Sequence, residues 1–563
     1  MLNFIRSLFS LTLLIILQAC TPLWGRSNEI SLNMVRTKTP TPFLSIDIPK
    51  PRKLTSYATP SSVPSEMVLT IEQPLQVWTS LAVPPLLADL LKSNGFKMTN
   101  DQASANFHII EQPLKDSKQT RWIYALVAPF PTITDEIKWQ DFLSMWRGEN
   151  SNSFKGVSIW IDSTTLEAIT SILGPPEAGI VRISPSEDLI KSTWNERPSW
   201  AIVPFEDIEP RWKVLSVDGQ SPIDKKFDEQ KYPLQVIFGF KEMNLPSSTI
   251  LPLSNRDPEK LTTLVMTGVT ALVRATAGKM ERNGVLYPGE GIRNWLVSAD
   301  LTHISNEIPF SDNCPFPDPN QADLVFCSDP KYISLLEDMG TDIVELTGNH
   351  FQDWGTDATI KTIEMYKERG WLYFGGGLDL KDAQSAKLII SNGNIFAFIG
   401  CNPAGPAFDW ATDSQPGAAP CNLPWMQSEV TRLRSEGYLP IVTFQYYESY
   451  SVQPGFEQLR DFQNIADAGA VIVNGSQAHL PQTMELRNGS FIHYGLGNLF
   501  FDQMDYPVIG TRREFIDRHI IYNGKYINTE LLTAMLEDYS RPRPMTPEER
   551  DLFLNDIFSA SGW

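Results

Sequence analysis

The residues best suited to chemistry lie in the stretch 345–355, which reads ELTGNHFQDWG. Here Gly348 lets the backbone turn sharply, Asn349 offers an amide oxygen, and His350 carries an imidazole that titrates near neutral pH. Taken alone, this tripeptide is explained equally well by an ordinary turn that holds a structural histidine. Its meaning therefore depends on the elements around it and on the rest of the chain.

Short apolar runs that end in polar loops recur through the second half of the chain. The run Ile343-Val344 predicts a buried strand directly before the stretch 345–355. The polar residues would leave that strand at its carboxyl end, where open α/β sheets place ligand sites. Further strands of this kind are predicted at 264–267, 396–400, 441–444 and 471–473. Together they indicate an α/β region that begins near residue 260.

Residues 67–250 show the same alternation and form a separate α/β region. A helix is predicted at 83–91, with proline near its first turn, and strands are predicted at 123–130 and 201–205. The order of the segments VAPFPT, WQDFLSMW and WAIVPFEDI is similar to the type 2 periplasmic solute-binding fold. The sequence of this region carries no metal or nucleophile motif, so a ligand-binding domain and a spacer domain are both open.

The charge balance excludes one class of partner. Among the 563 residues, 66 are Asp or Glu and 47 are Lys or Arg, which gives a formal net charge of -19. Binding to nucleic acid needs clustered basic side chains, and the sequence has no long basic run. We therefore expect no nucleic-acid partner. The length is enough for roughly three or four domains.

Residues 1–20 have the features of a targeting segment. Arg6 supplies a positive charge, the apolar run 8–17 is too short to span a bilayer, and the tetrapeptide LQAC that ends at Cys20 resembles a bacterial lipobox. Lipid on Cys20 would anchor an exported protein to the outer face of the cell membrane; the alternative is a plain secretory signal. Residues 21–66 are rich in Pro, Ser and Thr and are predicted to be a disordered linker.

Export would place the remaining four cysteines in an oxidising compartment. Cys314 and Cys327 lie close together in sequence, and so do Cys401 and Cys421, so two local disulfides account for all four. Three connectivities are open. Neither pair has the tight spacing of a zinc knuckle, which argues against a metal site built from these thiols.

Several motifs occur in a familiar order between residues 260 and 530. They read ISNE, ELTGNHFQDWG, FGGGLDLKDAQSA, DAGAVIVNGSQAHLPQTMEL and HYGLGNLFFDQ. This order resembles the CapA family of capsule poly-gamma-glutamate biosynthesis proteins, which is related to calcineurin-like metallophosphatases. The resemblance implies a sandwich of two mixed sheets flanked by helices, with a metal site at the strand ends. Residues 531–563 are expected to be a partly helical tail.

The resemblance also implies roles for individual residues. Glu307, Asn349 and His479 match metal-binding positions, and His350 matches an acid catalyst or anion-binding imidazole. Asp353 would accept the second ring proton of His350 and so orient the ring. A mixture of carboxylate, amide and imidazole suits Mn, Fe, Zn or Mg. The implied activity is the making, anchoring or trimming of an extracellular anionic polymer, together with other capsule-synthesis membrane proteins.

Four positions depart from the family pattern. Val269 follows Gly268 where a bridging carboxylate is expected, and Gln445, Ser476 and Gln477 stand where histidines are expected. An amide is a weak substitute for imidazole and valine is none, so we expect no tight dinuclear site.

Three outcomes are open for such a degenerate site. The first is catalysis with one metal or with fewer ligands, and the second is a metal-free scaffold that binds an anionic polymer or a small anion. The third is general acid and base catalysis by the same histidines and carboxylates without a metal.

Overall fold

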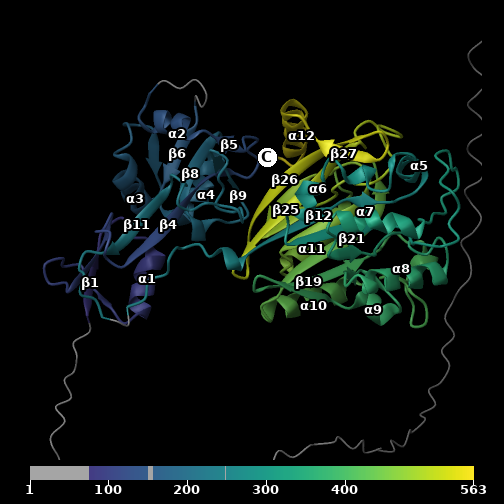
Figure 1. Ribbon diagram of the computed structural model, residues 1–563, viewed down its shortest axis with the longest axis horizontal. Coiled ribbons are helices and arrows are strands. Elements are labelled where there is room, and N and C mark those ends of the chain that lie inside the picture. Colours follow the sequence, from purple (N-terminus) through teal and green to yellow (C-terminus); the bar gives the residue numbers. More distant parts are fainter. Residues whose placement is uncertain (1–74, 150–155, 247–248) are drawn as a thin grey trace, which may run out of the picture. The chain divides into compact units, whose positions relative to one another are not determined.

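The computed structural model describes residues 75–149, 156–246 and 249–563. Two α/β regions follow one another along the chain, as the sequence predicts (Figure 1). The predicted signal segment 1–20 with Cys20 and the predicted linker 21–66 lie outside the described residues.

The N-terminal region is built on one nine-stranded mixed sheet. Its order is β2-β1-β3-β11-β4-β8-β6-β7, and β9 also pairs with β4. The strands are β1 (Gln76–Thr79), β2 (Lys97–Met98), β3 (Phe107–Glu111), β4 (Gln119–Pro129), β6 (Ser158–Ile161), β7 (Val181–Ile183), β8 (Ser199–Pro204), β9 (Trp212–Val214) and β11 (Gln235–Phe240). The helices are α1 (Pro85–Ser93), α2 (Trp139–Trp146), α3 (Ser163–Leu173) and α4 (Ser186–Asn195).

The long strand β4 lies at the centre of this region. It pairs with β11 along its first half and with β8 and β9 along its second half. Residues 122–129 are all buried, which explains why the sequence there is a continuous apolar run rather than an alternating one. The predicted helix at 83–91 begins at Pro85, the position in a first turn where the missing N–H of proline costs least.

The C-terminal region is a sandwich of two mixed sheets, so the predicted fold class is confirmed. The first sheet has the order β16-β15-β14-β12-β25-β26-β27, with β13 paired to β14, and the second has the order β18-β19-β21-β22-β24-β23. The strands of the first sheet are β12 (Leu261–Thr267), β13 (Val269–Thr270), β14 (Leu301–Asn306), β15 (Ile343–Glu345), β16 (Leu372–Phe374), β25 (Arg513–Tyr522), β26 (Lys525–Glu537) and β27 (Arg541–Pro544). Those of the second are β18 (Lys387–Ser391), β19 (Asn394–Cys401), β21 (Leu439–Ser449), β22 (Ile472–Ala478), β23 (Met484–Arg487) and β24 (Ser490–His493).

Alternating side chains of the strands form separate cores on the two faces of each sheet. In β12, Leu264 and Met266 pack in the core between the sheets, whereas Val265 packs beneath the outer helices. The outer helices of the first sheet are α5 (Arg274–Asn283), α6 (Arg293–Val297), α7 (Ile333–Asp338) and α8 (Thr356–Glu368). The second sheet is covered by α10 (Leu423–Ser435) and α11 (Phe456–Asp467). Figure 1 shows α8 and α10 in this region.

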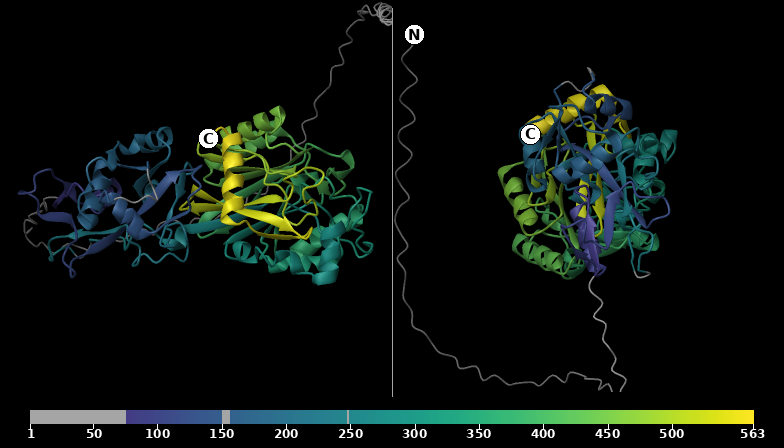
Figure 2. Two further views of the ribbon diagram at one scale, coloured as in Figure 1. Left: turned by 90° about the horizontal axis from the view of Figure 1, so that it is seen from above. Right: turned by 90° about the vertical axis from the view of Figure 1, so that its left-hand side faces the viewer.

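The end of the chain belongs to the sandwich, which corrects the expected boundary at residue 530. That residue lies inside β26, which pairs along its length with β25. The final helix α12 (Pro547–Ala560) packs Phe553 on Phe515 with ring centroids 4.5 Å apart. Figure 2 shows this helix beside the strands of the same colour. Residues 531–563 are therefore part of the core structure and not a tail.

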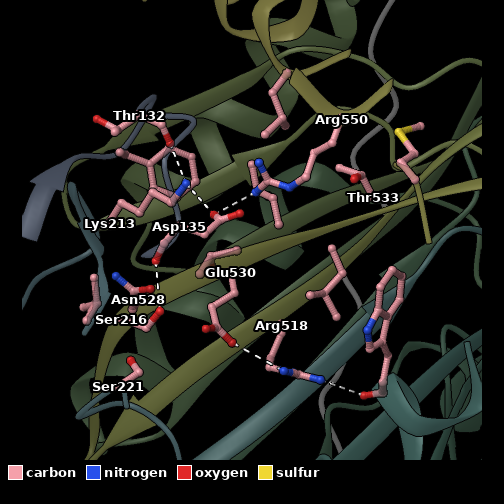
Figure 3. Close-up of a pocket in the computed structure, with 18 of the residues that line it drawn as sticks. Thr132, Asp135, Lys213, Ser216, Ser221, Arg518, Asn528, Glu530, Thr533 and Arg550 are labelled. Atoms are coloured by element: carbon pink, nitrogen blue, oxygen red, sulfur yellow. Dashed lines mark hydrogen bonds and ion pairs between the residues drawn. The ribbon is translucent and has the colours of Figure 1, made fainter. Parts of the chain in front are cut away.

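Charged side chains line a cavity of about 240 Å³ (Figure 3). Asp135 pairs with Lys213 at 2.6 Å and with Arg550 at 2.9 Å. Lys213 also donates to the carbonyl oxygens of Thr132 and Ile133, and burial lowers its pKa to about 8. The ammonium group is thus fully engaged by the protein itself.

Within the three described ranges, no helix combines the length and the apolar composition that crossing a membrane requires.

Candidate functional site

The candidate site lies where strands of both sheets reach their carboxyl ends. Glu307 directly follows β14, the stretch 345–355 continues from β15, and His479 directly follows β22. Gln445 and Ser476 are register partners on the neighbouring strands β21 and β22. The edge is the one at which parallel α/β sheets place their ligands.

Gly348 allows the loop after β15 to pass close to Glu307. A Cβ atom on Gly348 would lie 2.5 Å from the carbonyl oxygen of Glu307 and 2.6 Å from its Cα atom, which is closer than any side chain can come. As a result of this approach, Nε2 of His350 lies 3.6 Å from Oε1 of Glu307. The structure thus brings together two of the residues predicted from sequence.

Asp353 holds the ring of His350. Nδ1 of His350 lies 2.7 Å from Oδ2 of Asp353, and the same oxygen accepts the backbone N–H of Phe326 at 2.8 Å. An ionised carboxylate can only accept, so the proton on this side belongs to Nδ1 of His350. Nε2 is then the atom that faces Glu307, and the ring has one fixed orientation.

The surrounding charges shift the pKa of both ionisable groups. Burial lowers the pKa of His350, but the hydrogen bond that its Nδ1–H donates to Asp353 and the negative charges of Glu307, Asp353 and Asp409 outweigh this effect, so the net shift is upward. Burial raises the pKa of Glu307, opposed by His350, His479 and Arg274. Glu307 is buried, and its Oε2 has no hydrogen-bond partner among the described residues.

Three residues at predicted ligand positions bond to one another. Nε2 of Gln445 donates to Oδ1 of Asn349 at 2.9 Å, and the hydroxyl of Ser476 donates to Oε1 of Gln445. The amide oxygen of Asn349, expected to face a metal, is therefore occupied by a protein donor.

His479 approaches the same site from β22. Its Nδ1 lies 2.8 Å from Oδ1 of Asn498, so Nδ1 carries the proton and Nε2 presents a lone pair. The ring packs on Phe501 with centroids 4.8 Å apart, and when it is protonated its positive charge lowers the pKa of Glu307. No hydrogen bond of the described residues joins His479 to Asn349 or His350.

The residues present do not fit a dinuclear metal centre. Val269 is fully buried and has no donor atom, while Gln445 and Ser476 are used in the hydrogen bonds above. In the part of the chain that the structure describes, no group of three or more His, Cys, Asp or Glu side chains could hold a metal ion. The metal-binding roles predicted for Glu307, Asn349 and His479 stay predictions.

Two disulfide loops support the stretch 345–355, and the sequence analysis missed this. The predicted pairs Cys314–Cys327 and Cys401–Cys421 are both formed. Phe326 in the first loop bonds Asp353, as described above. In the second loop, Asp409 accepts the backbone N–H of Gln352 at 2.7 Å, and burial raises its pKa to about 7. The cysteine positions that bracket both segments were the available signal.

Arg274 also belongs to the site and was not predicted. It forms an ion pair with Asp502, and its guanidinium carbon lies 5.2 Å from the ring centroid of Phe326 and 5.7 Å from that of Phe501. Its φ angle of 46° is in the left-handed region, which a residue with a side chain adopts at a cost.

The comparison with known families agrees with this architecture. The model of the family "Bacterial capsule synthesis protein PGA_cap" matches residues 263–503. The fold is an α/β sandwich of two mixed sheets with a candidate site at its strand ends, preceded by an α/β region built on one mixed sheet. Residues 263–503 are thus similar to this family of capsule-synthesis proteins.

Two curated relatives that this chain resembles are both named CapA. The capsule biosynthesis protein CapA of Bacillus anthracis is 26% identical over 265 residues, which cover 46% of this chain and 64% of the relative. The PGA biosynthesis protein CapA of Bacillus subtilis (strain 168) is 25% identical over 173 residues, which cover 30% of this chain and 45% of the relative. The matched segment is thus less than two thirds of either relative.

Solved structures show only distant likeness. A 5'-nucleotidase precursor from Thermus thermophilus has 14% identity and a TM-score of 0.29, covering 54% of this chain and 58% of its own. An ABC-type phosphate transport receptor from Vibrio cholerae has 8% identity and a TM-score of 0.25, covering 29% and 86%. These TM-scores are too low to assign the fold by comparison. The description of the fold therefore rests on the strand order of the sheets.

Proposed function

We propose that this protein acts in the synthesis of a poly-gamma-glutamate capsule, by hydrolysing or transferring amide bonds of the polymer. The family match and the names of the two relatives support the polymer. The observation that carries the chemistry is the imidazole of His350, fixed by Asp353 with Nε2 directed at Glu307.

The site offers one histidine as an acid and another as a base. His350 has a raised pKa, so its ring is the proton donor, and Nε2 is the free position because Nδ1 is held by Asp353. In its neutral form His479 has its free lone pair on Nε2, because its Nδ1 donates to Asn498. Glu307 interacts electrostatically with both rings.

The proposed reaction assigns one proton transfer to each histidine. A water molecule attacks the carbonyl carbon of the amide while Nε2 of His479 accepts its proton. The C–N bond breaks as Nε2 of His350 gives its proton to the departing nitrogen. In a transfer reaction, an amine takes the place of water and loses its proton in the same way.

The second candidate is a non-catalytic scaffold for the same anionic polymer or for a small anion. Val269, Gln445, Ser476 and Gln477 favour it, because they replace ligands that a metal-dependent relative would need. A site that keeps its shape and loses its metal ligands can retain binding without chemistry.

We further propose that the protein is exported and works beside capsule-synthesis membrane proteins. The two disulfides fit an oxidising compartment. The anchor would be lipid on Cys20, and labelling cells with a radioactive fatty acid tests it. Label in the wild type and none in Cys20→Ser is the expected result; equal label in both contradicts the anchor.

The chain length of poly-gamma-glutamate, measured by size-exclusion chromatography after incubation with the protein, tests the function. We expect the wild type to shorten the polymer and His350→Gln to be at least about 100-fold slower. His108→Gln is the matched control, because His108 also contacts a carboxylate, that of Glu242, but lies in the N-terminal region. Binding without shortening would favour the scaffold, and neither binding nor shortening would contradict both candidates.

A further inference from the structure

An apolar groove of about 550 Å³ runs beside the loop closed by Cys314 and Cys327. Its apolar walls include Leu272, Val273, Ala277, Phe316, Leu324 and Trp354. Phe316 and Leu324 are 75% and 67% exposed, which is unusual for large apolar side chains that have no ligand to cover them.

Arg274 lines this groove and has unused hydrogen-bonding capacity. Its Nη2 donates to Asp502, but its buried Nε has no partner among the described residues. The ion pair and the rings of Phe326 and Phe501 fix the guanidinium in place. A guanidinium has five N–H groups in a planar fork, and a carboxylate can take two of them together.

The groove adjoins the candidate site. The ring of Phe326 contacts Arg274 and also the ring of His350, with centroids 4.9 Å apart in the second case. Trp354, from the same loop as His350, forms part of the groove wall. Arg274 and His350 thus contact the same aromatic ring.

We propose that this groove binds one carboxylate-bearing residue of an aliphatic amide chain, with Arg274 holding the carboxylate. The inference rests on the proposed function and adds a specificity-determining residue to it. Methylene groups of the chain would pack on the apolar walls. A gamma-linked glutamate chain has this chemistry, because each residue carries a free carboxylate and two methylene groups between its amides.

The charges of the protein argue for recognition of a single carboxylate. Asp323 and Asp329 in the groove lining repel a second carboxylate nearby. Arg274 is the fixed cation of the groove lining. Placing one carboxylate there sets which amide of the chain lies beside His350.

Isothermal titration with a short gamma-linked glutamate oligomer, and with the same oligomer amidated at its carboxylates, tests the proposal. The wild type should prefer the acidic oligomer, and Arg274→Gln should bind it about 10- to 100-fold more weakly and lose the preference. Arg282→Gln is the matched control, because Arg282 is an exposed residue of the same helix α5 and loses the same charge.

Two further variants test whether weaker oligomer binding by Arg274→Gln results from misfolding. Arg274→Lys keeps a cation for Asp502 but loses the fork, so we expect intermediate affinity. Phe316→Ser changes an exposed wall and should weaken both oligomers alike. If Arg274→Gln binds the oligomer as tightly as the wild type does, this inference is overturned. If the wild type nevertheless shortens the polymer, the proposed function stays intact. A wild type that neither binds the oligomer nor shortens the polymer would overturn both.

Discussion

Gly348 and Glu307 touch backbone to backbone, and this contact fixes the distance between the two halves of the candidate site. A Cβ on Gly348 would be 2.5 Å from the carbonyl oxygen of Glu307. The contact leaves His350 with its Nε2 3.6 Å from the carboxylate of Glu307. Any substitution that separates the two backbones also separates the acid from its neighbour.

We predict that Gly348→Ala reduces the free energy of unfolding by about 1–3 kcal/mol, because the added methyl overlaps the backbone of Glu307. The rate of polymer shortening should fall by more than the loss of folded protein alone would explain. Urea unfolding and the chain-length assay measure the two effects. Gly455→Ala is the control, because a Cβ there meets nothing within 4 Å. Wild-type activity in Gly348→Ala would show that the close approach does not matter.

We predict that replacing Cys314 and Cys327 with serine slows polymer shortening. The disulfide closes the loop whose Phe326 donates its backbone N–H to Asp353, and its loss frees that loop. Stability should fall by about 3 kcal/mol. Rates are compared in urea-free buffer, where the variant is folded. A variant that is less stable but fully active would contradict a role for this loop in holding Asp353.

The pKa of Asp409 predicts a pH-dependent stability. Burial raises this pKa to about 7 in the folded protein, above the value near 3.9 of an unfolded chain. The folded state therefore binds more protons, and the contribution to stability is complete below about pH 4 and is lost as pH rises to about 7. Its full size is up to about 4 kcal/mol.

Asp409→Asn should remove this slope. Urea unfolding at intervals between pH 4.5 and pH 7.5 (roughly the window in which the two states differ) measures it. We expect the wild type to lose more stability than the variant over that range. Glu206, whose pKa burial also raises to about 7, contributes equally to both proteins and cancels in the comparison. Parallel curves would show that Asp409 is ionised in the folded state.

Chelation is predicted to leave the activity within about two-fold of its untreated value, because Val269, Gln445 and Ser476 cannot supply the ligands of a dinuclear centre. Overnight dialysis against EDTA, followed by the chain-length assay, tests this. Loss of activity that Mn²⁺ or Zn²⁺ restores would show that Glu307 and His479 bind a metal after all.

Local patterns in the sequence were enough for most of the fold. Short apolar runs predicted β12, β15, β19 and β21, because the apolar residues of each run are buried in the cores on both faces of its sheet. Residues 531–563 were misjudged because β26 is specified by its pairing with β25 and by helix α12, which are contacts that no local pattern reveals.

The same distinction applies to the site. His350 and Asp353 are three residues apart in one loop, so their contact follows from local geometry. Arg274, Phe326 and Asp409 come from distant loops that the chain brings in through disulfides and helix packing. The roles of Glu307, Asn349, His350, Asp353 and His479 in chemistry stay predictions.

The most direct test of the central claim is the pH dependence of amine release from poly-gamma-glutamate, compared between the wild type and Asp353→Asn. The claim is that protonated His350, held by Asp353, is the acid. The wild-type rate should fall as pH rises through the raised pKa of His350. Because the variant loses the carboxylate that raises this pKa, its fall should begin at lower pH and its rate should be lower throughout. Identical profiles for the two proteins would contradict the account.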